Sequence, residues 1–189
     1  MKVVLLKTLR YKPGLKIAFK RLDKKDKNRV KRSPNLLGNP NFIASRILKK
    51  QVRSKRVCIS HKDGFCVLAC SAKNLGVDVE ALKDRDFDKF AQICFTDTEK
   101  EFLKNSCEKK LDFYKIFTTK EALIKCKNLT FADFKKVSFF DKGFIKTHFL
   151  KDDFMITLVL STRLNFAKKE RNEKCQCSCR RSRTERCYS

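Results

Sequence analysis

The sequence lacks several features that define common protein classes. It has no tryptophan and only five glycines and three prolines in 189 residues. This composition excludes collagen-like and other Gly- or Pro-repeat chains. No uncharged apolar run approaches the roughly 20 residues that a transmembrane helix needs. The opening MKVVLLKTLRYK has a short apolar run that a lysine interrupts, so it predicts a first strand rather than a secretory signal.

Acidic residues are scarce relative to basic ones. The chain has 46 Lys and Arg against 21 Asp and Glu, a formal charge of +25. The excess lies mainly in residues 1–56 and 167–189. Such a field attracts polyanions, whether nucleic acid, an acidic protein or a phosphorylated cofactor. Because 42% of the residues are hydrophobic, the chain can build a core, and wholesale disorder is excluded.

The ten cysteines fall into two groups. Without a secretory signal we expect a cytoplasmic, reducing compartment. Four cysteines stand in the terminal KCQCSCRRSRTERCYS, whose C-x-C-x-C spacing lacks the paired spacing of structural zinc sites. We expect residues 167–189 to be a disordered basic tail, with a metal site as the alternative. The others lie in apolar or amphipathic segments and are expected to be core residues or free thiols: Cys58, Cys66, Cys70, Cys94, Cys107 and Cys126.

Hydrophobic periodicity predicts a chain that mixes helices and strands. Residues 10–34 are dense in Lys and Arg and are expected to form a mobile loop or a short irregular helix. One strand is expected at 1–9, and three short strands across 56–80 with hairpin turns at 62–64 and 73–74. An antiparallel meander is expected across 136–161. Helices are expected at 41–52, 84–95, 96–104 and 111–126. The third of these begins with a capping box formed by Thr96 and Glu99.

The first segment that points to chemistry is LGVDVE, residues 75–80. Alternate residues of a strand share a face, so Val77 and Val79 are expected to face the core while Asp78 and Glu80 project together from the other side. Two carboxylates that close repel each other unless a cation lies between them. Taken alone, the pattern also fits an ordinary polar edge strand.

The second segment is FTTKEALIK, residues 117–125. On a helix Glu121 and Lys125 lie one turn apart at the margin of the apolar stripe, where a surface ion pair is the simpler interpretation. Lys120 falls near the middle of that stripe. A lysine there must extend to solvent or be held by a partner.

In order and spacing these segments resemble the signature of the 4′-phosphopantetheinyl transferase superfamily: Gly-Val-Asp-Val-Glu, about forty residues, then Phe-x-x-Lys-Glu-Ala-x-x-Lys. Upstream, Ile59-Ser60-His61-Lys62 and Phe42-Ile43-Ala44-Ser45-Arg46 resemble the Ser-His and arginine-helix elements of the larger, Sfp-type branch. Phe95, Thr96, Glu99 and Leu103 resemble the helix start between the two acidic motifs. The matched motifs run from about residue 42 to 125.

The resemblance implies an α+β fold of two similar, pseudo-dimeric halves, with antiparallel strands packed against helices. We expect an N-terminal half at 1–73 with the coenzyme A phosphate contacts, a C-terminal half at 74–166 with the metal site, and the tail beyond. The first half is shortened, because only about fourteen residues separate Arg46 from Ser60 and the usual Gly-Lys-Pro-like segment is absent.

The resemblance also implies an enzyme that transfers 4′-phosphopantetheine from coenzyme A to a serine of an acyl or peptidyl carrier protein. The implied metal is Mg²⁺, which favours carboxylate, water and phosphate oxygens, and its ligands are Asp78, Glu80 and Glu121. Glu121 is the implied base for the serine hydroxyl, with Glu80 as the alternative. Lys125 is implied to bind the diphosphate. Ser60, His61 and Arg46, with nearby Lys49, are implied to contact coenzyme A phosphates.

Two other functions stay open at this point. A basic nucleic-acid-binding protein without catalysis would explain the charge, but it has no recognisable RNA-binding signature and leaves the three carboxylates unexplained. The second alternative is a chain that keeps the fold but has lost activity because its coenzyme pocket is shortened. The carrier is expected to be acidic, because a basic transferase would attract it, and it could serve fatty-acid, polyketide or peptide synthesis. No membrane association is expected.

Overall fold

The computed structural model describes residues 4–54 and 56–162. The prediction of a disordered tail at 167–189 and the four tail cysteines lie outside this part of the chain. The N-terminal elements are one outer strand, three short helical segments, a longer helix and a hairpin: β1 (Leu5–Arg10), η1 (Phe19–Arg21), α1 (Lys24–Arg32), η2 (Pro34–Gly38), α2 (Pro40–Lys50), β2 (Val57–Lys62) and β3 (Phe65–Cys70).

The C-terminal elements repeat this plan with more helix. They are β4 (Leu75–Ala81), α3 (Phe87–Cys94), α4 (Asp97–Lys104), α5 (Lys109–Lys127), η3 (Phe131–Lys136), β5 (Phe144–Lys151) and β6 (Phe154–Ser161). The strand orders are β1-β3-β2 and β4-β6-β5, and every pairing is antiparallel. Each sheet therefore has its third strand in the centre and its helices inserted between its first and second strands. The expected α+β fold with two similar halves is confirmed.

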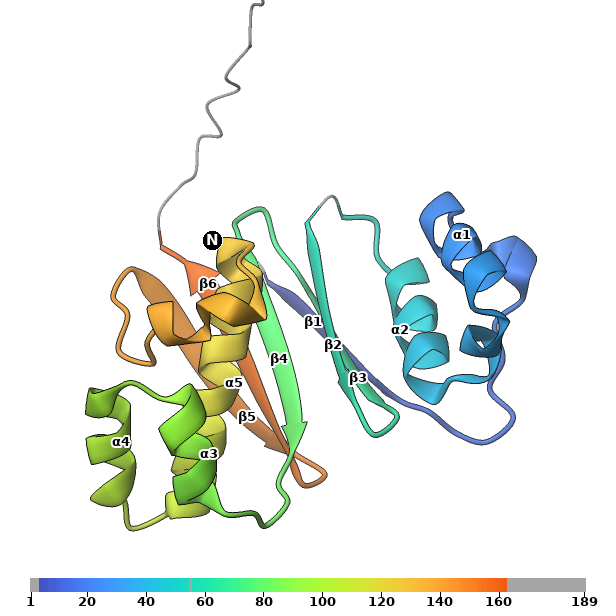
Figure 1. Cartoon of the computed structure of the whole chain (residues 1–189). Coiled ribbons are helices and arrows are strands. Elements are labelled where there is room, and N and C mark those ends of the chain that lie inside the picture. The colour runs from blue at the N-terminus through green and yellow to red at the C-terminus, as the bar shows by residue number, and fades with distance from the viewer. Residues whose placement is uncertain (1–3, 55, 163–189) are drawn as a thin grey trace, which may run out of the picture.

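The two sheets pack face to face, with helices on their outer sides (Figure 1). Successive residues of central strand β3 point in opposite directions. Phe65, Val67 and Ala69 pack with residues of β4 and β6 between the sheets, whereas Cys66 and Leu68 pack against α2. Because both faces of β3 are covered, all six of its residues are buried.

The second sheet shows the same division of its two faces. Val77 and Val79 of β4 enter the core between the sheets, as the strand pattern predicts. Met155 and Val159 of β6 face the other way and join the core under α5. Among the described residues, no helix has the length and apolar character needed to cross a membrane.

The helix predictions are confirmed closely where the sequence carries capping residues. Thr96 and Glu99 form the expected capping box, with Thr96 Oγ1 accepting from the Glu99 N–H and Glu99 accepting from the Thr96 N–H. In the basic segment at 10–34 the structure differs from the loop or irregular helix expected there. Asp23 caps α1 by accepting from the Asp26 N–H, and Val30 anchors the helix in a small core with Phe42. The cap, the apolar contact and the ion pairs of the buried Asp26 with α2 together hold a regular nine-residue helix.

Two strand predictions are wrong. The turn at 62–64 does form a hairpin, with Asp63 and Gly64 both at positive φ, but residues 73–74 connect β3 to a strand of the other sheet. The chain before residue 141 is also not part of a meander. Phe134 of η3 enters the core there, and the backbone beyond it contacts a buried ion pair described below. Neither outcome follows from local pattern, because both depend on partners distant in the sequence.

The six cysteines of the described residues are free thiols, as expected. Four of them are buried and Cys58 is partly buried, which fits small core residues. Cys107 is exposed and does not belong to the core.

Candidate active site

Helix α5 lies directly against β4 because Gly76 has no side chain. A Cβ at Gly76 would lie 1.8 Å from the carbonyl oxygen of Ala122, much closer than any non-bonded contact. Alternate residues of β4 face this helix, so Asp78 and Glu80 share the side of the strand on which Gly76 lies. Figure 1 shows α5 running along β4. The close approach therefore brings the two carboxylates beside the helix that carries the second motif.

Asp78, which is buried, and Lys125, which is partly buried, form an ion pair at the centre of the site. Lys125 Nζ lies 2.7 Å from Asp78 Oδ1, and the same oxygen accepts a hydrogen bond of 2.8 Å from Ser60 Oγ. Lys125 also donates to Ser60 Oγ at 3.0 Å. Burial opposes the charge on Lys125, but Asp78 outweighs it and raises the pKa of the ammonium. Lys125 thus pairs across the fold rather than with Glu121 on its own helix.

Strands β2 and β4 lie side by side although they belong to different sheets, and the Ser60 contact is one of three that join them. Cys58 Sγ accepts from the Val77 N–H at 3.3 Å. At the other end of the row, Lys62 Nζ lies 2.7 Å from Glu80 Oε2. Residues 58, 60 and 62 alternate along β2 and therefore point the same way. The site is built at the junction of the two halves.

Glu121 is the third carboxylate of this junction. It is half-buried, and no hydrogen bond or ion pair from the described part of the chain reaches its carboxylate. Burial and then the charge of Asp78 raise the pKa of Glu121 to about 6, with Lys125 partly offsetting them and Glu80 adding a smaller upward effect. The three predicted carboxylates therefore lie within one another's electrostatic field.

The donor set fits a hard divalent cation. Asp78 Oδ2 is buried and accepts no hydrogen bond within the described chain, an arrangement that costs free energy unless a cation or a donor satisfies the oxygen. Three carboxylates are the ligands that Mg²⁺ prefers. In the geometry described here, lysine ammoniums hold two of them, and the described residues include no ready cluster of three metal-ligating side chains. A metal bound by the three carboxylates would lie beside these two ammoniums and would be repelled by them.

A basic cavity of about 280 Å³ opens beside Lys125 where α5 ends. Two further cationic residues, Arg56 and Lys73, line it, so it presents positive charge next to the ion pair. The remaining lining residues are Val57, Asn74, Leu75, Cys126 and Asn128. The size and charge of this cavity suit part of a phosphorylated ligand.

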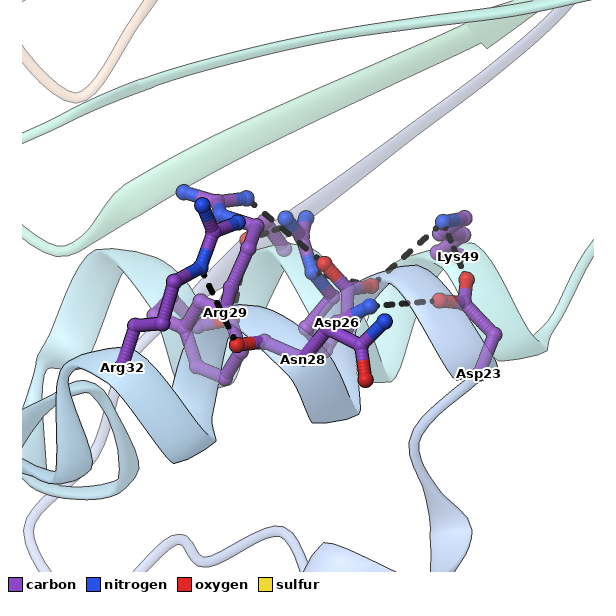
Figure 2. Close-up of polar contacts among 9 residues, drawn as sticks. Asp23, Asp26, Asn28, Arg29, Arg32 and Lys49 are labelled. Atoms are coloured by element: carbon purple, nitrogen blue, oxygen red, sulfur yellow. Dashed lines mark hydrogen bonds and ion pairs between the residues drawn. The ribbon is translucent and has the colours of Figure 1, made fainter.

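Arg46 lies apart from this centre, on α2. Its Nε is 2.7 Å from Oδ2 of Asp26, a carboxylate with only 4% of its side chain exposed. Figure 2 shows Asp26 between Arg29 and Lys49, and Lys49 also reaches Asp23 at 2.6 Å. The arginine is therefore held by a buried counter-ion within the N-terminal half and does not contact Ser60.

His61 lies between these two groups of charges. It follows Ser60 on β2 and points to the opposite side of the strand. Partial burial lowers the pKa of His61, and the charges of Lys125 and Arg46 lower it further. The imidazole is consequently neutral at pH 7, where it can donate or accept a hydrogen bond but adds no positive charge.

Lys120 is fully buried and is held by a partner, as its position in the apolar stripe requires of a lysine that does not reach solvent. Its Nζ lies 2.7 Å from Glu99 Oε2 and donates to the Val137 carbonyl at 2.7 Å. The other carboxylate oxygen of Glu99 accepts from the Phe139 N–H at 2.6 Å. This ion pair fastens α5 to the start of α4 and to residues 137–139, so Lys120 supports the helix and does not face the junction.

Three residues that shape the site carry no assigned role in the sequence motifs: Lys62, Asp26 and Gly76. Lys62 could have been found by extending the alternation of β2 from Ser60. Gly76 carries a signal of its own, because a glycine inside a strand indicates the close approach of another backbone. For Asp26, whose partners Arg46 and Lys49 lie on a different helix, the sequence carries no comparable signal.

Comparison with known proteins identifies the family of the chain. A family model described as the 4′-phosphopantetheinyl transferase superfamily matches residues 74–175, more than half of the chain. The matched range includes Asp78, Glu80, Glu121 and Lys125, whereas Ser60 and the other N-terminal site residues precede it. A search of curated proteins finds no match. The chain belongs to the 4′-phosphopantetheinyl transferase superfamily, whose activity is phosphopantetheinyl transfer.

Proposed function

We propose that this protein transfers 4′-phosphopantetheine from coenzyme A to a serine of an acidic acyl or peptidyl carrier protein in a Mg²⁺-dependent reaction. The observation that carries the proposal is the convergence of Ser60, Asp78 and Lys125 from β2, β4 and α5 at one buried point. Glu121 stands beside them. A nucleic-acid-binding protein has no need for carboxylates at its basic surface, because they repel phosphates.

Asp78, Glu80 and Glu121 would hold the metal. The unsatisfied Asp78 oxygen and the mutual repulsion of the carboxylates support this assignment. When bound, Mg²⁺ supplies charge neutralisation for the diphosphate of coenzyme A. The rest of the chemistry can be assigned to the chain's own residues.

Lys125 would bind the diphosphate. Its ammonium lies between the carboxylates and the basic cavity, so phosphate oxygens placed at the mouth of that cavity would meet it. There it would offset the charge that develops on the leaving phosphate. Ser60 would contact the diphosphate from the N-terminal side, whereas His61, on the opposite face of β2, and Arg46 would contact another phosphate of coenzyme A toward α2. We assign the coenzyme contacts to residues 1–73 and the metal site to 74–166.

In the transfer step the carrier serine oxygen forms a bond to phosphorus and the bond to the bridging oxygen breaks. Adenosine 3′,5′-bisphosphate leaves, and the serine proton must pass to a base. We assign this role to Glu121 acting directly or through water, because no ion pair occupies its carboxylate in the described structure. Glu80 is less suited, since Lys62 holds it at 2.7 Å.

The formal charge of +25 supports an acidic carrier as the partner, because complementary charge speeds encounter. A cytoplasmic location and a role in fatty-acid biosynthesis belong to the same proposal. Incubation with apo carriers of the fatty-acid, polyketide and peptide-synthetase classes would identify the substrate.

The proposal is tested by comparing two lysines of one helix. Lys125→Ala should slow transfer about a hundredfold or more at saturating coenzyme A and carrier, because an interaction made in the transition state is lost. Lys127→Ala is the matched control: Lys127 pairs with Asp141 at 2.7 Å, away from the junction. A Lys125→Ala rate within about threefold of the Lys127→Ala rate would contradict the assigned role.

A further inference from the structure

Lys62 is a cation inside the carboxylate cluster and lies outside the residues that the family model matches. Its Nζ is 2.7 Å from Glu80 Oε2, with 35% of the lysine side chain and 17% of the glutamate side chain exposed. Its charge also acts on Glu121. Lys62 is therefore placed at the carboxylates that the proposed function assigns to a metal.

The two lysines of the site are held very differently. Lys125, with 29% of its side chain exposed, makes contacts to Asp78, Ser60 and a backbone carbonyl. Lys62 is 35% exposed, and its ion pair with Glu80 is the only one it makes with the described residues. A lysine on a flexible stem with a single, partly exposed partner can leave that partner at small cost. Lys62 is thus the more easily displaced of the two ammoniums.

Lys62 pairs with Glu80 Oε2 at 2.7 Å and so offsets the negative charge that Glu80 can offer to a second cation. A divalent ion that approaches Glu80 meets the positive charge of Lys62 at close range, and this repulsion weakens its binding unless Lys62 moves away. We propose that Lys62 is a positioning residue that competes with the divalent cation for Glu80 and thereby weakens metal binding to the free enzyme. This inference rests on the metal site of the proposed function and adds a residue that sets its affinity.

The test measures Mn²⁺ binding to the purified full chain by titration, with free Mn²⁺ followed by electron paramagnetic resonance. The variants are Lys62→Met and Lys62→Gln, each checked for an unchanged melting temperature. Lys83→Met is the matched control, because Lys83 Nζ lies 2.7 Å from Asp63 in the hairpin turn and its removal changes the net charge equally. Asp78→Asn identifies the binding that belongs to this site.

Both Lys62 variants should bind Mn²⁺ about fivefold more tightly than the parent, the size of effect that a partly exposed ion pair can have on an equilibrium constant. Lys83→Met should stay within about twofold of the parent. If the parent binds Mn²⁺ through Asp78 and neither Lys62 variant binds it more tightly, the role of Lys62 is wrong and the metal site stands. If no protein shows binding that depends on Asp78, the metal site and the role of Lys62 are both wrong.

Discussion

Replacing Lys120 with methionine removes the cation of a fully buried ion pair and leaves the Glu99 carboxylate without its charged partner. Both side chains have 0% exposure, so water cannot take the place of the ammonium. Breaking a buried pair on one side costs about 3–5 kcal/mol. For a chain of this size each kcal/mol corresponds to about 2–4 °C, so Lys120→Met should melt roughly 6–20 °C below the parent.

The assay is thermal unfolding followed by circular dichroism, with Lys115→Met as the matched control. Lys115 lies on the same helix and pairs with Asp112 where 34% of the lysine side chain is exposed, so its loss should cost less than about 1 kcal/mol. Adding Glu99→Gln to Lys120→Met should recover part of the loss, because the unpaired charge is removed. A Lys120→Met protein as stable as the control would refute the structural role of this pair.

Two further changes test the packing and the charge of the site. Gly76→Ala forces α5 away from β4 and should lower the free energy of unfolding by about 3 kcal/mol or more, as measured by urea denaturation. A urea midpoint equal to that of the parent would contradict the close approach of the helix and the strand. The fold raises the pKa of Glu121 from its ordinary value of 4.5 to about 6, so the folded state holds this proton more tightly than the unfolded state does. The protein therefore loses stability as the pH rises from 4.5 to 6. The free energy of unfolding of Glu121→Gln should therefore exceed that of the parent by about 1 kcal/mol at pH 7 in metal-free buffer, allowing for the partial exposure of the side chain, and should equal it at pH 4. Equal gains at both pH values would show that the carboxylate charge is not the cause.

Local patterns in the sequence predict the elements that carry their own signals. The capping residues Thr96 and Glu99 mark the start of α4, and the alternation of Val77, Asp78 and Val79 gives the correct faces of β4. The same alternation places both carboxylates of the first motif on the side that faces α5. Much of the candidate site thus follows from periodicity combined with the family resemblance.

Pairings between distant segments could not be predicted in this way. The strand partner of β4 is β6, about eighty residues later, and nothing in residues 73–80 indicates it. The counter-ions of Arg46 and Lys120 likewise come from other helices. A local pattern shows that a buried charge needs a partner, but only the tertiary fold shows which residue supplies it.

We propose that the carboxylate cluster serves a metal-dependent phosphopantetheinyl transfer. The decisive measurement is the intact mass of an apo carrier protein after incubation with coenzyme A and the enzyme, with Mg²⁺ or with excess chelator. We expect conversion to the holo form with Mg²⁺ and none with chelator or with Asp78→Ala. Equal conversion in chelator, or none under any condition with any of the three carrier classes, would contradict it.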